Sequence, residues 1–141
     1  MFGPHLMLDC YGCDEKKLKN LEFVLKFLDD LPAIIGMHKI AEPYAIDYPG
    51  KSNSFDKGGI SAVVIIAESH ISIHTFPCNG YMSVDIFSCK DFDVEGAVEY
   101  IREAFNVRKF EKKLLSRGTE FPKDVPKAMK IVEKQRGKIK F

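Results

Sequence analysis

Two apolar stretches of strand length flank a polar junction at the centre of the chain. Residues 60–66 are apolar and mostly β-branched apart from one serine, and residues 80–89 have the composition of another strand. Glycine, asparagine, aspartate or proline normally follows such a strand. Here the chain instead carries Glu68, Ser69 and His70, whose side chains can all take part in chemistry. Because apolar strands would hold these side chains rigidly at a sheet end, we interpret the junction as the functional centre.

Hydrophobic periodicity predicts the remaining elements. A strand is expected over residues 5–11, followed by one amphipathic helix that Asp14 caps and Pro32 stops. Asp93 has the position of the cap of a second helix. The other expected elements are strands over 39–46 and 107–115 and a short basic helix over 125–135.

These elements together predict a fold class. Three consecutive strands joined by tight turns are expected to pair antiparallel. Two long helices can cover only one face of such a sheet, so we expect a two-layer α+β sandwich. Residues 60–66 are apolar at both odd and even positions, which indicates that both sheet faces are buried at the centre. We therefore expect a second copy to pack on the open face, giving a homodimer with four layers.

Length and composition narrow the class of protein. A chain of 141 residues fits one domain, and 45% hydrophobic with 29% charged residues is ordinary for a soluble globular protein. No apolar run reaches the roughly 18 residues that a membrane span needs. The first residues lack the basic and apolar regions of a secretory signal. We expect a cytoplasmic protein with no membrane partner.

The net charge of +1 conceals a basic end. Residues 108–141 contain 12 Lys or Arg and 4 Asp or Glu, a net charge of +8, which leaves 9 basic and 16 acidic residues, a net charge of −7, in the rest. A basic end can bind nucleic acid or an acidic partner. It has no glycine-rich loop and no interleaved aromatic residues for base stacking, so we expect a solvated surface helix and no nucleic-acid partner.

The four cysteines leave two interpretations open. Cys10 and Cys13 have the C-x-x-C spacing of zinc sites and redox pairs. Cys78 and Cys89 are eleven residues apart and do not form the second close pair of a four-cysteine zinc site. Because scattered cysteines in a cytosolic chain are mostly reduced and buried, we favour core thiols and expect no metal.

Several kinds of chemistry fit the junction. Ser69 beside His70 and His74 resembles a nucleophile with its base, although the G-x-S-x-G arrangement of hydrolases is absent. The two histidines share one face of an extended strand, and Asp85 or Cys89 could complete a metal site. Spacing alone is equally compatible with two histidines that are simply hydrogen-bonded.

A family resemblance favours one of these chemistries. Residues 68–77 followed by residues 80–89 resemble the core of the short prokaryotic S-adenosylmethionine decarboxylase proenzymes, including the spacing of Ser61, Ser69, His74 and Cys89. The resemblance extends weakly from residue 5 to about residue 118. We therefore expect a decarboxylase domain over 1–118 and a basic, helical C-terminal extension over 119–141.

The resemblance implies that the enzyme makes its own pyruvoyl cofactor by self-cleavage. The Ser69 hydroxyl would attack the Glu68 carbonyl, and elimination with His74 as base would split the chain between Glu68 and Ser69. Ser69 would become the pyruvoyl group, and Ser61 would stabilise charge on the carbonyl. Strict strand alternation places Ser69 opposite His74, so we expect the strand to break near Glu68, through strain or a bulge.

The resemblance also implies the reaction of the cleaved enzyme. The pyruvoyl carbonyl would bind the substrate amine as a Schiff base and draw electrons during loss of CO₂. Cys89 would then donate a proton to the product, a task suited to a thiol with a pKa near 8.5. The product would supply aminopropyl groups for spermidine biosynthesis.

One departure from the family pattern concerns the substrate. Cys78 stands where S-adenosylmethionine decarboxylases usually carry a glutamate that holds two ribose hydroxyls. The resemblance nevertheless places Asp9, Phe55 and Phe2 as substrate-binding residues. S-adenosylmethionine is the expected substrate, with arginine or ornithine as alternatives within the superfamily. A homologue that is never processed is the remaining alternative.

Overall fold

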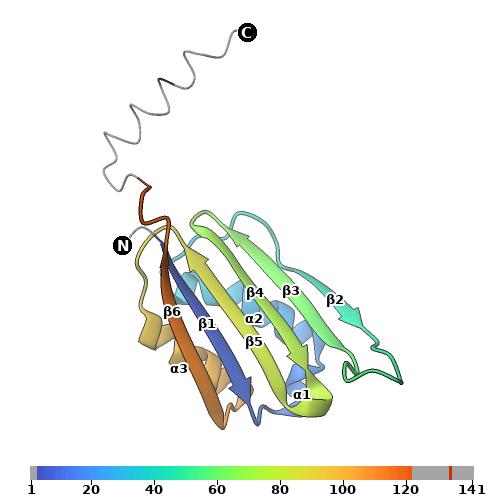
Figure 1. The fold of residues 1–141 in the computed structure, drawn as a ribbon. Coiled ribbons are helices and arrows are strands. Elements are labelled where there is room, and N and C mark those ends of the chain that lie inside the picture. Colours follow the sequence, from blue (N-terminus) through green and yellow to red (C-terminus); the bar gives the residue numbers. More distant parts are fainter. Residues whose placement is uncertain (1–2, 122–133, 135–141) are drawn as a thin grey trace, which may run out of the picture.

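One antiparallel sheet lies against a layer of helices (Figure 1). The computed structural model describes residues 3–121 and residue 134, and within them the strand order is β2-β3-β4-β5-β1-β6. The strands are β1 (Gly3–Tyr11), β2 (Tyr44–Tyr48), β3 (Gly59–Ile66), β4 (Ser69–Phe76), β5 (Tyr81–Ser88) and β6 (Lys109–Arg117). The helices are α1 (Glu15–Leu18), α2 (Leu21–Ile34), the 3-10 helix η1 (Pro77–Asn79) and α3 (Val94–Phe105). This arrangement confirms the predicted two-layer α+β sandwich.

Side-chain alternation assigns each strand residue to one face of the sheet. In β3, Ile60, Val64 and Ile66 are buried on the face that the helices cover. Ser61 and Ile65 alternate with them and lie on the other surface, which we call the open face. Burial alternates with the same period of two along β4 and β5. The pairing register of these strands therefore assigns each of their residues to one face of the sheet.

A single chain buries only one face at the centre of the sheet, so the predicted burial of both faces depends on the predicted second copy. Ile65 is 44% exposed, and Ser61 and Val63 are only partly buried. The helices of the described chain lie on one side of the sheet, so the open face keeps contact with solvent (Figure 1). Other exposed apolar side chains on this face are Tyr44, Ile46 and Leu115. A second copy on this face stays a prediction.

Capping side chains divide the predicted first helix in two. Asp14 accepts hydrogen bonds from the backbone N–H groups of Lys16 and Lys17 and begins α1, as predicted. Asn20 accepts from the N–H of Phe23 and begins a new helix, α2. The single continuous helix was therefore wrong, because an asparagine that caps a helix has extended rather than helical backbone angles.

Proline accounts for two further differences from the predicted boundaries. Pro32 lies inside the last turn of α2, which continues to Ile34 instead of stopping. Pro43 directly precedes β2, and a residue without an N–H is disfavoured in a paired strand, so this strand begins at residue 44 rather than 39. Lys39 forms only an isolated bridge with Ile66.

The C-terminal elements agree with the prediction more closely. Asp93 accepts from the N–H of Gly96 and caps α3. The last strand is shifted by two residues, to Lys109–Arg117. The basic helix predicted over 125–135 falls outside the described residues, apart from residue 134. In the described part of the chain, no helix has the length and apolar character needed to cross a membrane.

The core between the helices and the sheet contains a buried hydroxyl, that of Thr75, which links three elements. Phe105 of α3 is fully buried, and its ring packs edge-on against Phe27 of α2 with 4.9 Å between ring centroids. Thr75 of β4 lies in the same layer and is 3% exposed. Its hydroxyl donates to the Leu18 carbonyl (2.7 Å) and accepts from the Ile60 N–H (2.9 Å), so it joins α1, β3 and β4.

The C-x-x-C pair belongs to this core. Cys10 and Cys13 are buried as free thiols, whereas Cys78 and Cys89 are exposed. Burial, followed by the nearby Cys13 and Asp9, raises the pKa of the Cys10 thiol to about 12. Burial raises the pKa of Cys13 to about 11. Among the described residues, no group of three His, Cys, Asp or Glu side chains is placed to hold a metal ion.

We predict that Thr75→Val destabilises the fold although it preserves side-chain shape. Removing the hydroxyl leaves the Ile60 N–H and the Leu18 carbonyl without this partner, at roughly 1–3 kcal/mol for each buried group. Urea unfolding followed by circular dichroism should therefore show a loss of about 2–4 kcal/mol. The control Thr75→Ser keeps the hydroxyl and should lose less. A stability for Thr75→Val equal to that of the wild type would contradict the bridging role.

We predict that only two of the four cysteines alkylate in the native protein. The thiolate is the reactive form, and thiols with pKa values of about 12 and about 11 are almost wholly protonated at pH 8. Iodoacetamide at pH 8 should modify Cys78 and Cys89 rapidly, and should modify Cys10 and Cys13 only after denaturation. Peptide mass spectrometry measures this, and rapid native labelling of Cys10 would overturn the assignment of the pair to the core.

Candidate active site

The turn between β3 and β4 gives Ser69 an unusual backbone conformation. Ala67 and Glu68 make the turn, and Ser69 is the first residue of β4, paired with Ile66 of β3 and Ser88 of β5. Ser69 has a φ of 154°, a value that residues other than glycine rarely adopt. The irregularity that the sequence predicts near Glu68 therefore takes the form of a positive φ at Ser69.

The carbonyl of Glu68 is held by a backbone donor. The Cys89 N–H donates to the Glu68 oxygen at 2.8 Å, across the ends of β4 and β5. An N–H aimed at a carbonyl polarises it and can stabilise negative charge that develops on its oxygen. Two predicted site residues are thus next to the Glu68 carbonyl: Cys89 through a hydrogen bond and Ser69 through the peptide bond.

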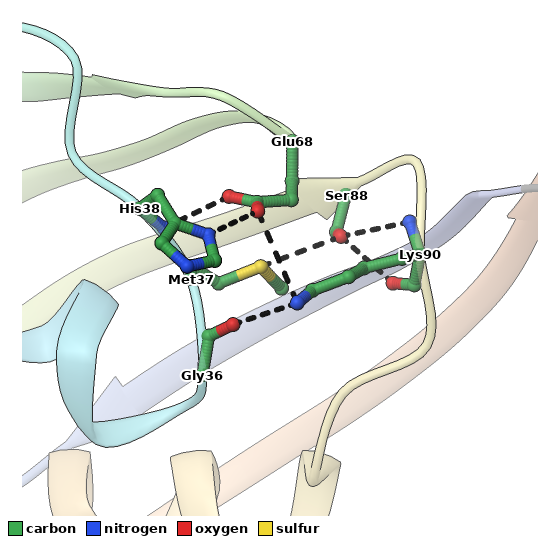
Figure 2. Close-up of polar contacts among 6 residues, drawn as sticks. All are labelled: Gly36, Met37, His38, Glu68, Ser88 and Lys90. Carbon is green, nitrogen blue, oxygen red and sulfur yellow. Dashed lines mark hydrogen bonds and ion pairs between the residues drawn. The ribbon is translucent and has the colours of Figure 1, made fainter.

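The side chain of Glu68 is also held, by contacts with His38 and Lys90 (Figure 2). Glu68 is 8% exposed, and its carboxylate accepts from the His38 backbone N–H at 2.9 Å. The His38 Nδ1 lies 2.8 Å from the other carboxylate oxygen, and the Lys90 Nζ is 3.9 Å from that same oxygen. His38 and Lys90 were not predicted from the sequence, because neither belongs to a recognisable motif.

These contacts set the ionisation of the Glu68 carboxyl. Burial raises its pKa, but the hydrogen bonds from the His38 ring and backbone lower it more, so the pKa lies below its ordinary value. The carboxyl is therefore ionised at neutral pH and can only accept hydrogen bonds. It follows that the His38 Nδ1 carries a hydrogen and donates it.

A second group of predicted residues lies near the other end of β4. Ser61 and His74 are directly opposite each other on β3 and β4, and the Ser61 hydroxyl is 2.8 Å from the His74 Nδ1. Asp9 belongs to the same row of the open face, since Ser83 pairs with both His74 and Asp9. A hollow of about 220 Å³ beside this group is lined by Tyr44, Ile46, Ser61, Ala62, Val63, Ser72 and His74.

A single chain does not bring the two groups together. Ser69 and His74 are five residues apart on β4, which at about 3.3 Å per residue separates them by roughly 16 Å. Within the chain, the base nearest to the Ser69 hydroxyl in the described contacts is the Nδ1 of His70, at 3.3 Å. Ser69 with Cys89 and Ser61 with His74 therefore form two separate groups, one toward each end of the sheet, which we call candidate half-sites. By register, Ser69 falls in the row of the helix-covered face and His74 in the row of the open face.

The predicted substrate-binding residues are dispersed. Phe55 lies in the loop before β3 and is 86% exposed, whereas Phe2 lies outside the described residues. Asp9 accepts a hydrogen bond from the Tyr81 hydroxyl at 2.9 Å. Cys78 lies in η1 beside a hollow of about 290 Å³ that Asp47 and Lys57 also line.

Comparisons with known proteins agree on one family. The family model described as S-adenosylmethionine decarboxylase matches residues 4–118. An S-adenosylmethionine decarboxylase proenzyme of Clostridium botulinum is 35% identical over 117 residues, which cover 82% of this chain and 94% of the relative. The proenzyme of a Geobacillus species is 36% identical over 129 residues, 92% of this chain and 97% of the relative.

A solved structure extends the agreement to the fold. The crystal structure of the adenosylmethionine decarboxylase from Aquifex aeolicus superposes with a TM-score of 0.69 and 28% sequence identity. The superposition covers 87% of this chain and 95% of that protein. The resemblance inferred from the motif is confirmed by all three comparisons, and the chain belongs to the S-adenosylmethionine decarboxylase family.

Proposed function

We propose that this protein is a self-processing S-adenosylmethionine decarboxylase that cleaves itself between Glu68 and Ser69. The observation that carries the proposal is the local geometry of the Glu68–Ser69 peptide bond. The Glu68 carbonyl accepts a hydrogen bond from the Cys89 N–H, and Ser69 has a φ of 154°. Membership of a family whose relatives are named as proenzymes supports the same conclusion.

The residues at this bond fit the formation of a pyruvoyl group from Ser69. The Ser69 oxygen attacks the Glu68 carbonyl carbon, and the C–N bond breaks as the C–O bond of an ester forms. Removal of the Ser69 α-hydrogen then breaks the bond between the Ser69 Cβ and the ester oxygen. A C=C bond forms at residue 69, which becomes dehydroalanine, and Glu68 keeps the oxygen as a free carboxylate. Water replaces the nitrogen of residue 69, which leaves as ammonia. The Cys89 N–H is placed to stabilise the charge that develops on the Glu68 oxygen during attack.

The pyruvoyl group, once formed, supplies an electron sink for loss of CO₂ from the substrate. The chain's own contribution at that stage is proton transfer and orientation. The Cys89 thiol is exposed and follows β5 directly beside residue 69, where it can donate a proton to the product. Cys89 thus has two separable roles, because its backbone N–H serves cleavage and its side chain serves decarboxylation.

Two copies of the chain would join the half-sites. The Ser61–His74 pair and the exposed apolar residues Ile46 and Ile65 all lie on the open face. Suppose that two sheets face each other and are related by a two-fold axis that lies between them, perpendicular to the strands. The β4 strands of the two copies then run antiparallel to each other. Ser69, at the start of β4 in one copy, then lies toward the His74 end of the other, so each of two sites takes one half from each chain. Register puts Ser69 in the row of Ile66, on the helix-covered face, so this site also requires the Ser69 side chain to turn toward the open face. We propose this homodimer as the active form.

The proposed substrate is S-adenosylmethionine, after the names of the relatives. Cys78 cannot make the two hydrogen bonds with which a glutamate would hold a ribose, since a thiol is a single weak donor. Arginine and ornithine are therefore the competing substrates to test. Release of CO₂ from each carboxyl-labelled amino acid by the purified protein discriminates among them.

We predict different outcomes for substitutions at the two residues that flank the Glu68 carbonyl. Denatured wild-type protein should give two masses, residues 1–68 and a fragment that begins with pyruvoyl at position 69. Ser69→Ala should give one uncleaved chain. Cys89→Ala keeps the backbone N–H, so it should still be cleaved but should release CO₂ about 10²-fold or more slowly. Full activity of Cys89→Ala would remove the thiol from the mechanism.

We predict that two inactive variants complement each other. His74→Ala and Ser69→Ala should each remain uncleaved when produced alone. When they are produced together in equal amounts, roughly half of the His74→Ala chains should meet a Ser69→Ala partner and be cleaved. Mass spectrometry of the mixture measures this fraction. Absence of cleavage in isolated mixed dimers, or normal cleavage of His74→Ala alone, would exclude a site shared between chains and would favour His70 as the base.

A further inference from the structure

We propose that His38 and Lys90 are positioning residues for self-cleavage, which hold the Glu68 carboxylate and thereby keep the Glu68–Ser69 bond in its reactive conformation. We call Glu68, His38 and Lys90 the carboxylate clamp. The inference rests on the proposed cleavage between Glu68 and Ser69, and it assigns a role to the side chain of the residue that precedes the nucleophile.

The first side of the clamp is the segment that follows α2. The His38 N–H donates to Glu68 Oε1 at 2.9 Å, its Nδ1 lies 2.8 Å from Oε2, and its carbonyl accepts from the Ala67 N–H at 2.7 Å. Lys39 then bridges to Ile66 at the end of β3. His38 thus contacts both residues of the turn, through two backbone groups and one side chain.

The second side of the clamp is the segment that follows β5 (Figure 2). The Lys90 Nζ lies 3.9 Å from Glu68 Oε2 and donates to the Gly36 carbonyl at 2.7 Å. The backbone of Lys90 is held at both polar groups by the hydroxyl of Ser88, which is fully buried. Cys89, between them, donates its N–H to the Glu68 carbonyl. One short segment therefore restrains Glu68 at its carbonyl and at its carboxylate.

This double restraint acts on the torsion that makes Ser69 unusual. The φ of Ser69 describes rotation of the Glu68 carbonyl carbon about the Ser69 N–Cα bond. Cys89 holds the Glu68 carbonyl, His38 and Lys90 hold its carboxylate, and the His38 carbonyl holds the Ala67 N–H. These contacts oppose the rotation of Glu68 that would let Ser69 reach a negative φ. Two-residue hairpin turns normally contain glycine or asparagine, so a glutamate here has no turn preference to explain it.

The exposure of the partners argues against a purely structural ion pair. The side chains of His38 and Lys90 are 73% and 46% exposed, and exposed ion pairs contribute little to the stability of a fold. A structural pair would affect cleavage, turnover and thermal stability together. A positioning pair affects cleavage alone, because the peptide bond that it holds no longer exists in the mature enzyme.

The test compares the rate of cleavage with the turnover of cleaved protein. Lys90→Met and His38→Ala should slow conversion of the newly made chain into two fragments by about tenfold to a hundredfold, since small misplacements of reacting atoms have effects of this size. Lys90→Arg keeps the charge and should restore most of the rate. The rate is measured by gel and mass spectrometry on samples quenched at successive times after synthesis.

Lys39→Met is the matched control. It removes a lysine from the segment that contains His38, but the ion pairs of Lys39 are with Asp29 and Glu42, not with Glu68. This variant should be cleaved at the wild-type rate. Once each clamp variant has been fully cleaved, its kcat/KM for S-adenosylmethionine should be within twofold of the wild-type value.

Each alternative outcome has a distinct meaning. Wild-type cleavage rates in both Lys90→Met and His38→Ala would overturn the clamp. Equal losses in cleavage, in kcat/KM and in melting temperature, or failure of both variants to fold, would assign the cluster to structure and also overturn it. A wild-type chain that stays uncleaved at Glu68–Ser69 would instead refute the proposed function on which the clamp depends.

Discussion

The tight connection between β3 and β4 is the constraint on which the candidate site depends. Two residues, Ala67 and Glu68, must reverse the chain between strands whose alternate residues are buried, and neither has the conformational freedom of glycine. The unusual φ is then found at Ser69, a conformation that costs on the order of 1–3 kcal/mol. A hydrogen bond to a charged group contributes roughly 1.5–3 kcal/mol, so the bond that the His38 backbone N–H donates to the buried Glu68 carboxylate is large enough to offset it.

The same turn organises segments that are distant in the sequence. The end of α2 reaches it through His38, and the end of β5 reaches it through Cys89 and Lys90. All three contacts converge on Glu68 rather than on Ser69. In the proposed cleavage, the carbonyl that is attacked is therefore held by several contacts, whereas the attacking hydroxyl of Ser69 has one neighbouring histidine nitrogen. Such an arrangement suits a bond that must break once and is never re-formed.

The two-layer architecture explains why one chain does not bring Ser69 and His74 together. Helices bury one face of the sheet, and alternation places Ser61, His74 and Asp9 on the other. An eight-residue strand is long enough to separate Ser69 from His74 by about 16 Å. No local rearrangement short of breaking the β4 pairing would bring them together. The proposed site shared between two open faces would resolve this distance and would also cover exposed apolar residues such as Ile65.

The sequence by itself determined the features that depend on neighbours along the chain. Alternation identified the strands, Asp14 and Asp93 marked two helix starts, and the block around Ser69 identified the family. Short-range patterns suffice there because strand period and capping are local. The tertiary structure alone decided that Asn20 starts a new helix, that the open face is exposed, and that Ser69 lies far from His74. It alone also brought His38 and Lys90 to Glu68, because contacts across 30 and 22 positions follow from strand register and packing, which no local pattern records.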